Sequence, residues 1–350
     1  MSAEEGTRRI ALALLRATIA ARERLDRSDD VEALHDFRVA LRRLRSWMRA
    51  LGRERLSSVR KRDRRALTTL SRAAGSARDA EVHVAWLRDA EHSWRPRERP
   101  GGEWLLRRLV DQHRAADAAF RALLADGFSR TVTRLGKALA VYTIRVDLRD
   151  PRPVPTLALA IAPLIQEHAA ALGDRLSAIR SVQDQALAHA ARIAGKRLRY
   201  TLEPIADSVR DGPQLVKRLR HLQDTIGEMH DVHVMAETVI AAAEEAGAEQ
   251  ARRTAAALLE GAGVDSGGHR EHTPDLRPGL LATAALLRSR GDSAYLELQQ
   301  RWLGPHALDL TRDARAVAAT LAGTIDDSST GAPQLDDGAP SERAASVAPA

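Results

Sequence analysis

Cysteine is absent from the 350 residues, and aromatic residues make up only 3% of them. Without cysteine the chain can form no disulfide, no thiolate nucleophile and no cysteine-ligated zinc site. The shortage of aromatic side chains leaves Leu, Ala, Val and Ile to fill the core, which is typical of packed helices and unfavourable for β-sandwiches. These absences predict an all-α protein.

Long apolar runs are missing too. No uninterrupted stretch approaches the ~20 residues that a helix needs to span a bilayer. The first residues, MSAEEGTRRIALALLR, begin with acidic side chains and lack the pattern of a signal peptide. We therefore expect a soluble, cytoplasmic protein that has no membrane partner.

Lysine is scarce although the chain is basic. Lys and Arg together number 54 against 47 Asp and Glu, which gives a formal net charge of +7. The only lysines in the sequence are Lys61, Lys137, Lys196 and Lys217. Arginine carries a planar guanidinium group that binds a phosphate or carboxylate through two parallel hydrogen bonds. Because an arginine-rich composition explains most surface arginines, the places where they cluster are more informative than their number.

One cluster lies in residues 34–51, LHDFRVALRRLRSWMRAL. At 100° per residue the cationic side chains fall on an arc of roughly 80°, and apolar side chains fill the rest, which predicts an amphipathic helix. Like charges at i,i+3 and i,i+4 destabilise such a helix by a few tenths of a kcal/mol per pair. An isolated cationic row can simply be solvated, whereas a bound polyanion would relieve its repulsion. The row consists of His35, Arg38, Arg42, Arg45 and Arg49.

The same pattern returns 154 positions later, in HAARIAGKRLRYT at residues 189–201. A repeat of this length predicts two copies of one supersecondary unit, and the doubling favours a polyanion ligand over a solvated surface. Glu203 takes the position that Arg49 has in the first copy, where it would pair with Arg199 or bound the site. We therefore expect the first copy to bind its ligand more strongly. The second row consists of His189, Arg192, Lys196 and Arg199.

A second pair of segments repeats at an offset of 152, with LTTLSRAAGSARDAEV aligned to LRHLQDTIGEMHDVHV. The aligned glycines, Gly75 and Gly227, are expected to break their helices. The aspartates that follow, Asp79 and Asp231, would then be ordinary helix caps. Alternatively, Asp79 would pair with Arg43 and Asp231 with Arg197, fixing those guanidinium groups for the ligand.

Together the two motifs resemble those of the CHAD family, the conserved histidine α-helical domain. The resemblance covers roughly residues 5–320, and no part of the chain resembles the CYTH domain that often accompanies CHAD domains. It implies two tandem four-helix bundles related by a pseudo-twofold axis, with extra helices. It also implies inorganic polyphosphate as the ligand, with polyphosphate granules and their associated proteins as further partners.

The resemblance further implies which residues bind the polyphosphate chain. In the first copy they are His35, Arg38, Arg42, Arg43, Arg45 and Arg49. In the second copy they are His189, Arg192, Lys196, Arg197 and Arg199. Arg65 and Lys217 are second-tier contacts. Because Arg43 and Arg197 lie off the narrow arc, a neighbouring helix would have to bring the ligand to them, unless they pair with the aspartates instead.

Proline-rich and polar segments divide the chain. We expect a first helical repeat at 1–146, a proline-rich junction at 147–155 and a second repeat at 156–323. The tail at 324–350 has few large apolar residues and is predicted to be disordered.

Helical periodicity predicts most of the secondary structure, with a mobile loop at 261–279. Pro163 and Pro204 are expected to kink or divide the helices that contain them. The predicted helices are 4–26, 34–51, 54–74, 77–91, 103–124, 128–146, 156–179, 183–209, 214–226, 228–246, 280–290, 293–303 and 308–321.

The matched histidines His35 and His189 admit more than one interpretation. A metal site with help from His83, His230 and His233 is opposed by Coulomb repulsion, since a divalent cation would sit among arginines. Packed structural histidines are another possibility. If instead the two imidazoles contact phosphate, binding raises their pKa values, and affinity increases as the pH falls through ~6.5.

No catalytic pattern is present in the sequence. It contains no GxxxxGK(S/T) phosphate loop, no Ser-His-Asp arrangement that can be placed and no carboxylate cluster suited to Mg²⁺. We therefore predict a non-catalytic polyphosphate-binding protein that needs no cofactor and no metal. The main alternative is sequence-independent binding of RNA or DNA, although aromatic stacking platforms are few and a helix-turn-helix signature is missing. An enzyme acting on phosphoanhydrides is the third hypothesis.

Overall fold

The protein is described by a computed structural model, which covers residues 1–27, 29–30, 32–141, 155–259 and 274–323. Within these ranges the only extended pairing is an isolated bridge between Ser2 and Thr156, and the predicted all-α class is confirmed. None of the helices in this part of the chain combines the length and hydrophobicity that crossing a bilayer requires. The elements are α1 (Ala3–Arg24), α2 (Ala33–Ala50), α3 (Gly52–Arg55), α4 (Lys61–Ala90), η1 (Glu91–Ser93), α5 (Arg99–Ala140), α6 (Leu157–Ala178), α7 (Gln185–Leu202), η2 (Glu203–Ser208), α8 (Gly212–Leu259), α9 (Arg277–Trp302) and α10 (Pro305–Gly323).

Four helices are longer than the sequence pattern predicts. Gly75 lies inside α4 and Gly227 inside α8, so the predicted helix breaks at these glycines are wrong. The predicted interruptions of α5 and α9 are wrong in the same way, because each of these helices is continuous. A glycine in a helix interior costs only about 1 kcal/mol relative to alanine. Burial of neighbouring side chains, such as Ala74 and Ala77 in α4 and Ile226 in α8, outweighs that cost.

The two prolines behave differently. Pro163 is exposed inside α6 and does not divide it. Pro204 lies at the start of η2, and α7 ends at Leu202 rather than at residue 209 as predicted. Proline lacks an N–H and clashes with the carbonyl group four residues earlier, so the chain leaves the α-helical conformation here. Asp211 then adopts φ +62° at the turn into α8, a conformation that aspartate tolerates better than most residues.

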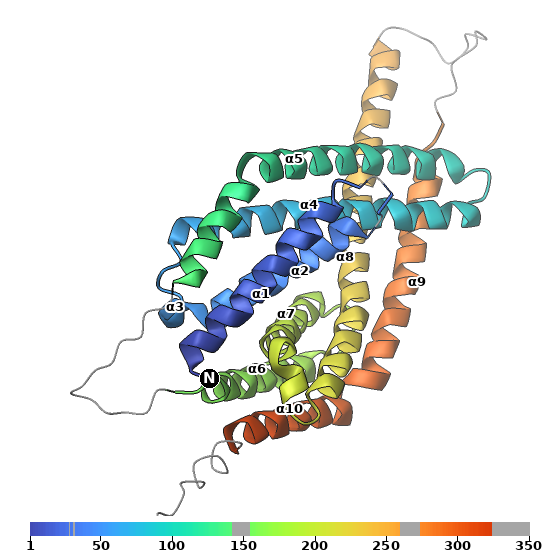
Figure 1. Cartoon of the computed structure of the whole chain (residues 1–350). Coiled ribbons are helices and arrows are strands. Elements are labelled where there is room, and N and C mark those ends of the chain that lie inside the picture. Colours follow the sequence, from blue (N-terminus) through green and yellow to red (C-terminus); the bar gives the residue numbers. More distant parts are fainter. Residues whose placement is uncertain (28, 31, 142–154, 260–273, 324–350) are drawn as a thin grey trace, which may run out of the picture.

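The helices pack in two groups that meet along one seam (Figure 1). The first group contains α1, α2, α4 and α5, and the second contains α6, α7, α8 and α10, with α9 alongside α8. Contacts of α2 with α7, of α1 with α6 and of α5 with α9 join the groups. The backbone also joins them, because the Ala3 N–H donates a hydrogen bond to the Pro155 carbonyl at 2.8 Å.

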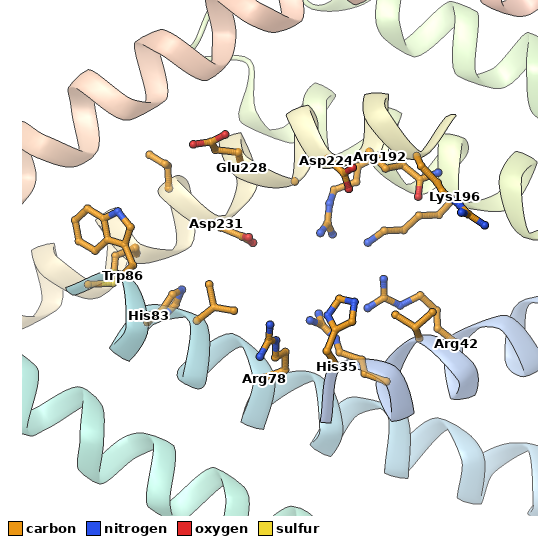
Figure 2. Close-up of a pocket in the computed structure, with 18 of the residues that line it drawn as sticks. His35, Arg42, Arg78, His83, Trp86, Arg192, Lys196, Asp224, Glu228 and Asp231 are labelled. Atoms are coloured by element: carbon orange, nitrogen blue, oxygen red, sulfur yellow. The ribbon is translucent and has the colours of Figure 1, made fainter. Parts of the chain in front are cut away.

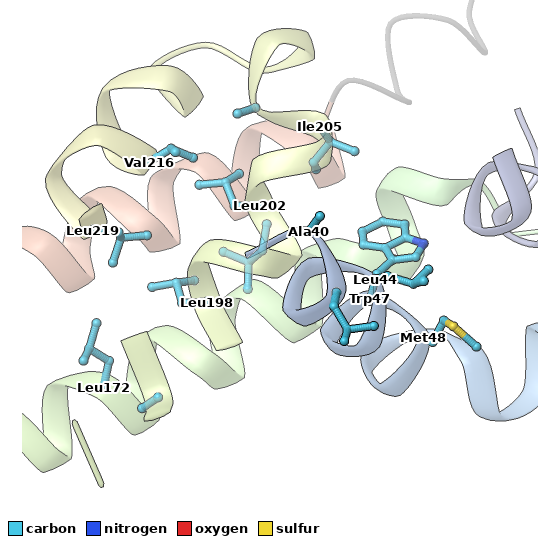
Figure 3. Packing of buried hydrophobic residues seen from close by; sticks show 14 of the residues in the cluster. Ala40, Leu44, Trp47, Met48, Leu172, Leu198, Leu202, Ile205, Val216 and Leu219 are labelled. Atoms are coloured by element: carbon cyan, nitrogen blue, oxygen red, sulfur yellow. The ribbon is translucent and has the colours of Figure 1, made fainter. Parts of the chain in front are cut away.

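Apolar faces fix the orientation of the two motif helices. On α2, the side chains of Phe37 and Leu44 are completely buried, and the Phe37 ring lies 5.8 Å from that of Phe120 on α5. On α7, Leu198 and Leu202 are completely buried in the same core (Figure 3). Because these faces point into the core, the cationic faces of both helices point away from it. This arrangement positions the site described below.

A smaller core joins the far ends of the long helices. It contains Leu87 of α4, Leu105 of α5, Met235 of α8 and Leu280 of α9, all less than 3% exposed. Packing of four helices around this cluster fixes α4 relative to α8. These two helices form facing walls of the candidate site.

The repeated motifs fall on corresponding helices. The first motif lies on α2 and α7, and the second lies on α4 and α8. The internal duplication and its division into repeats at 1–146 and 156–323 stay predictions. The predicted junction at 147–155 lies outside the described residues except for Pro155, and the predicted tail at 324–350 lies outside them entirely. Most of the loop expected at 261–279 is also outside, although its last residues belong to α9.

The continuity of α4 predicts that Gly75→Ala stabilises the protein. A Cβ at Gly75 meets no atom within 4 Å, and alanine loses less backbone freedom in a helix, so the free energy of unfolding should rise by about 0.5–1 kcal/mol. Urea unfolding measures the change.

Gly304→Ala is the matched control. Its added Cβ also meets nothing within 4 Å, but the φ of Gly304 is +60°. An L-residue is strained there, so this substitution should lower the free energy of unfolding by about 1 kcal/mol. A similar loss in Gly75→Ala would contradict an unbroken α4.

Candidate functional site

A cavity of about 660 Å³ lies between α2 and α4 on one side and α7 and α8 on the other (Figure 2). Residues of α9 complete its wall. Its volume falls within the range of roughly 300–1,000 Å³ that is usual for small-molecule sites. It therefore has room for a ligand rather than only for a few water molecules.

The cationic rows of α2 and α7 both line this one cavity. Spacings of three and four residues place the basic side chains of each helix on one face. Arg192 and Lys196 extend from α7, and Arg42 extends toward them from α2 (Figure 2). The predicted residues that line the cavity are His35, Arg38, Arg42, Arg43, Arg192, Lys196 and Arg199.

Some cations at the cavity wall have carboxylate partners. Arg38 Nη2 lies 3.0 Å from Asp79 Oδ1 on α4. Arg43 donates two hydrogen bonds to Glu203, at 3.0 Å from Nε and 2.7 Å from Nη2. Glu203 also accepts a hydrogen bond from Arg220 of α8. Such charge-assisted and bidentate contacts fix the side chains that make them.

Four other cations at the cavity have no carboxylate partner within 4.0 Å among the described residues, and we call them the unpaired quartet. Two of its members contact Tyr200 instead. Arg199 donates to the Tyr200 hydroxyl at 2.9 Å and lies 4.6 Å from the centre of its ring, and Arg42 reaches the same hydroxyl at 3.5 Å. The unpaired quartet consists of Arg42, Arg192, Lys196 and Arg199.

Several buried donors at the cavity also lack acceptors. The Nε atoms of Arg192 and Arg199 and the Nε2 atom of Gln223 are inaccessible to solvent and have no hydrogen-bond partner in the described structure. Buried polar groups are nearly always hydrogen-bonded, and an unmet donor costs about 1–3 kcal/mol. Unpaired donors beside unpaired cations indicate a site built for an anion with several acceptor oxygens.

Charge repulsion in the cavity perturbs the titration of Lys196. Burial, followed by the neighbouring charges of Arg192 and Arg42, lowers the pKa of Lys196 from 10.5 to about 6. Lys196 is therefore largely neutral at pH 7 in the free protein. Burial also lowers the pKa values of Arg38 and Arg192.

Histidines in or near the cavity also have lowered pKa values. Burial lowers the pKa of His35, with a further contribution from Arg78, and it lowers the pKa of His189, with a contribution from Arg192. Burial and Arg192 lower the pKa of His230 to about 4. Among the described residues no three His, Asp or Glu side chains gather closely enough to hold a metal ion.

Two predicted residues at the end of the first row point into a different groove. Arg45 and Arg49 line a smaller groove of about 350 Å³, together with Lys61 and Arg64. Arg45 is held there by a hydrogen bond of 2.7 Å from Nη1 to Ser71 Oγ. The row on α2 therefore continues past the end of the cavity.

Four more predicted residues do not line the cavity. The ring of His189 packs against that of His230, with the centroids 4.7 Å apart. Arg197, Arg65 and Lys217 are exposed on the outer surfaces of their helices. Arg197 is next to Lys196 in sequence, so the 100° step between helical neighbours turns it away from the cavity.

Two predicted ion pairs are wrong. Arg43 pairs with Glu203 rather than with Asp79, and Asp79 pairs with Arg38. The expected contact between Glu203 and Arg199 is replaced by those with Arg43 and Arg220. The reason is tertiary: Glu203 at the start of η2 lies within reach of Arg43 on α2 and of Arg220 on α8.

The predicted capping role of Asp79 and Asp231 is also wrong. Both lie in the interiors of unbroken helices, Asp79 in α4 and Asp231 in α8. Neither is near a helix N-terminus. Asp231 lines the cavity, and Asp79 pairs with Arg38 at its edge.

Sequence reasoning missed several residues that line the cavity. Arg78 adjoins Asp79 in the repeated segment and Tyr200 directly follows Arg199, so proximity to the motifs was an available signal. Gln223 and Arg220 lie on the face of α8 that lines the cavity, toward α2 and α7. Nothing in the sequence points to residues of α9. The missed residues include Arg78, Trp86, Tyr200, Arg220, Gln223 and Arg290.

Comparison with known proteins agrees with this architecture. The CHAD domain family model matches residues 9–240, well over half of the chain. The crystal structure of the CHAD domain from the plant Ricinus communis is similar, with a TM-score of 0.57 and 18% sequence identity over 92% of each chain. At that identity the likeness shows the fold alone. A search of curated proteins gives no match.

The fold and its central cavity define an all-helical protein with a site lined by cationic side chains. The family match is more specific, and this chain belongs to the CHAD domain family. The membership predicted from the paired motifs is thereby confirmed.

The buried charge of Lys196 predicts that Lys196→Met stabilises the free protein. An ammonium group without a carboxylate partner is costly to bury, so the free energy of unfolding at pH 6 should rise by about 1–3 kcal/mol. Urea unfolding measures it. In Lys217→Met, where the lysine is exposed, the change should stay within about 0.5 kcal/mol.

The same substitution should also change how stability depends on pH. The pKa of Lys196 is about 6 when folded and 10.5 in the unfolded chain, so between these values the unfolded state binds more protons. Stability of the wild type therefore rises with pH in this window, by up to about 1.4 kcal/mol per unit from this group. The advantage of Lys196→Met should shrink as the pH rises from 6 to 10. A constant difference would contradict the perturbed lysine.

Proposed function

We propose that the cavity binds inorganic polyphosphate. The observation that carries this proposal is the unpaired quartet, a group of cations that meet in one cavity without a carboxylate partner. A chain of phosphates offers a negative charge and non-bridging oxygens at every unit. It would bring negative charge and acceptor oxygens to all four side chains of the quartet at once.

The hydrogen-bonding capacity of the cavity supports a phosphate ligand. The Nε atoms of Arg192 and Arg199 and the amide of Gln223 are buried donors without an acceptor in the described structure. Phosphate oxygens would satisfy them where these side chains turn into the cavity on binding. Arginine binds phosphate through two parallel hydrogen bonds, which are roughly twice as strong as those between neutral groups. The ligand would thus supply both the negative charge that the quartet lacks and the acceptor atoms that the unpartnered donors lack.

Membership of the CHAD family supports the same ligand, because CHAD domains are linked to polyphosphate binding in general. We propose that the cavity binds polyphosphate without hydrolysing it. We also propose that the protein acts in the cytoplasm and on polyphosphate granules, with the proteins associated with those granules as partners. Release of orthophosphate from polyphosphate by the purified protein would overturn the assignment of binding alone.

Nucleic acid is the second candidate, and the shape of the site disfavours it. The quartet lies inside a cavity between helices, whereas the phosphates of a duplex lie on the outside of a wide rod that needs an open basic surface. In our proposal RNA and DNA are competitors that bind weakly to exposed arginines.

The proposal predicts that Arg42→Gln combined with Arg192→Gln lowers polyphosphate affinity on the order of 100-fold, because two charge-assisted contacts are lost. Binding of long-chain polyphosphate by titration calorimetry measures the change. Polyphosphate should also outcompete RNA and double-stranded DNA at equal phosphate concentration.

The matched control is Arg65→Gln combined with Lys217→Gln, which removes the same charge from exposed positions outside the cavity. This variant should lose only a few-fold in affinity, through weaker long-range attraction. Equal losses in the two variants would show that diffuse charge, and not the cavity, holds the ligand.

The proposal also predicts a pH dependence that arises from Lys196. A bound polyanion favours the ammonium form and raises the pKa of Lys196 above its free value of about 6. Binding then takes up a proton, so affinity falls as the pH rises from 6 to 8, by up to tenfold per unit.

Lys196→Arg is the control, because arginine stays charged over this range. The titration of the ligand itself is common to both proteins and cancels in their ratio. The affinity of the wild type relative to Lys196→Arg should therefore fall with rising pH. A ratio independent of pH would exclude proton uptake by Lys196.

A further inference from the structure

The cavity has two chemically different ends. Along α4 its wall changes from Arg78 through Val82 to Trp86, which share one helix face at spacings of four residues. The eight steps from Arg78 to Trp86 correspond to about 12 Å along the helix at 1.5 Å per residue. In Figure 2 the indole of Trp86 lies at one end, and Arg42 and Lys196 lie at the other.

The end at Trp86 is mainly apolar, although His83 also lines the cavity beside the indole (Figure 2). Val82 and Trp86 of α4 face Val232 and Met235 of α8, with Leu287 of α9 beside them. Trp86 is partly exposed and packs against the smaller core that joins the long helices. An inorganic phosphate chain has no apolar group to pack against an indole and aliphatic side chains. The proposed function therefore does not explain this end of the cavity.

Carboxylates lie between the two ends. Glu228 is paired with Arg290, with Nε and Oε1 2.8 Å apart. Asp231 forms no ion pair and accepts no hydrogen bond within the described part of the chain, although it lines the cavity. Removal from water raises the pKa of Asp231, with a further contribution from Asp79. The positive charges of Arg192 and Arg38 oppose this shift. Asp231 is exposed to the solvent of the cavity, so water can donate to its carboxylate in the free protein. A bound polyanion would displace some of that water and repel the carboxylate, so a ligand that carries hydrogen-bond donors suits this point.

We propose that the cavity binds a nucleoside polyphosphate, with its phosphates on the unpaired quartet, its ribose hydroxyls donating to Asp231 and its base against Trp86. This inference rests on the proposed function, since it uses the same cations to hold the phosphates. It deepens that function by adding a recognised group at one end of the phosphate chain.

The order of chemical groups along the cavity matches that of such a ligand. A nucleotide presents phosphates, then a sugar with hydroxyl donors, then a flat ring with a π-face. Carboxylates commonly accept hydrogen bonds from ribose hydroxyls in nucleotide sites. A lipid diphosphate fits less well, because its hydrocarbon tail offers no donor to Asp231 and would remove more water from it.

The test compares ATP with inorganic tripolyphosphate, both in EDTA, by titration calorimetry on the full-length protein. Tripolyphosphate carries more charge, so charge alone would make it the tighter ligand. Stacking of a base on an aromatic ring corresponds to roughly a 5- to 100-fold gain in affinity. We expect ATP to bind at least about fivefold more tightly than tripolyphosphate.

Substitutions at Trp86 separate stacking from packing. Trp86→Leu should lower the affinity for ATP at least about fivefold more than that for tripolyphosphate, whereas Trp86→Phe should retain most of the preference. Trp104→Leu is the matched control, since Trp104 packs against the same smaller core and lies outside the cavity. Tripolyphosphate binding by each variant reports whether its cavity is intact.

Asp231→Ala tests the sugar contact. Removing this carboxylate should raise the affinity for tripolyphosphate and lower the preference for ATP, and 2′,3′-dideoxy-ATP should show the same reduced preference with the wild type. If the effect of Asp231→Ala appears only when Mg²⁺ is present, the carboxylate binds a metal ion and the ribose contact is wrong.

The outcomes distinguish this inference from the proposed function. Suppose that the wild type binds tripolyphosphate and long-chain polyphosphate, that it binds ATP no more tightly than tripolyphosphate, and that Trp86→Leu leaves the ratio of the two affinities unchanged. Then only the nucleoside proposal is wrong. If the wild type binds none of these phosphates, the proposed function falls as well.

Discussion

The mutual repulsion of cations in a poorly hydrated cavity is the interaction on which the rest of this structure depends. Arg42 on one helix shares a cavity with Arg192 and Lys196 on another, and the two arginines lower the pKa of Lys196. None of the three has a carboxylate within 4.0 Å in the described part of the chain. Coulomb energy rises as water is removed, so the arrangement is costly in the empty protein. The apolar faces on the opposite sides of α2 and α7 supply the free energy that holds it together. The same two helices therefore contribute both the buried apolar side chains of the core and the repelling cations of the cavity.

Carboxylates are used selectively around this strained centre. Asp79 and Glu203 neutralise Arg38 and Arg43 and fix their orientation, while the quartet beside them stays unpaired. Pairing every cation would have made the protein more stable and left nothing for a ligand to neutralise. The distribution of acidic residues thus separates cations that shape the wall from cations available for binding.

The sequence was sufficient to predict the all-α class, the family and the two cationic helix faces, because these follow from local periodicity and an internal repeat. It was not sufficient to predict where each face points. Arg38 and Arg42 share a cavity with α7, whereas Arg45 and Arg49 on the same row enter another groove. That division depends on the crossing of α2 and α7, and no spacing within one helix contains it.

The errors in the sequence prediction have one main source. Treating Gly75 as a helix break made Asp79 a cap, although a single glycine costs too little to end a well-packed helix. Ion-pair partners were missed for a related reason: Glu203 meets arginines from two other helices, which only tertiary packing brings near. Arg290 lies on α9, beyond both sequence motifs, so no pattern connects it with the cavity.

The unbroken course of α4 and α8 has a consequence for how quickly and selectively a ligand can be captured. The helices α4 and α8, which pack together through the smaller core, hold opposite walls of the cavity apart before a ligand binds. Such preorganisation means that little backbone entropy is lost on association and that the width of the slot discriminates by itself. Entry should then be limited by diffusion and by steering in the field of the arginines, rather than by a slow rearrangement of the fold.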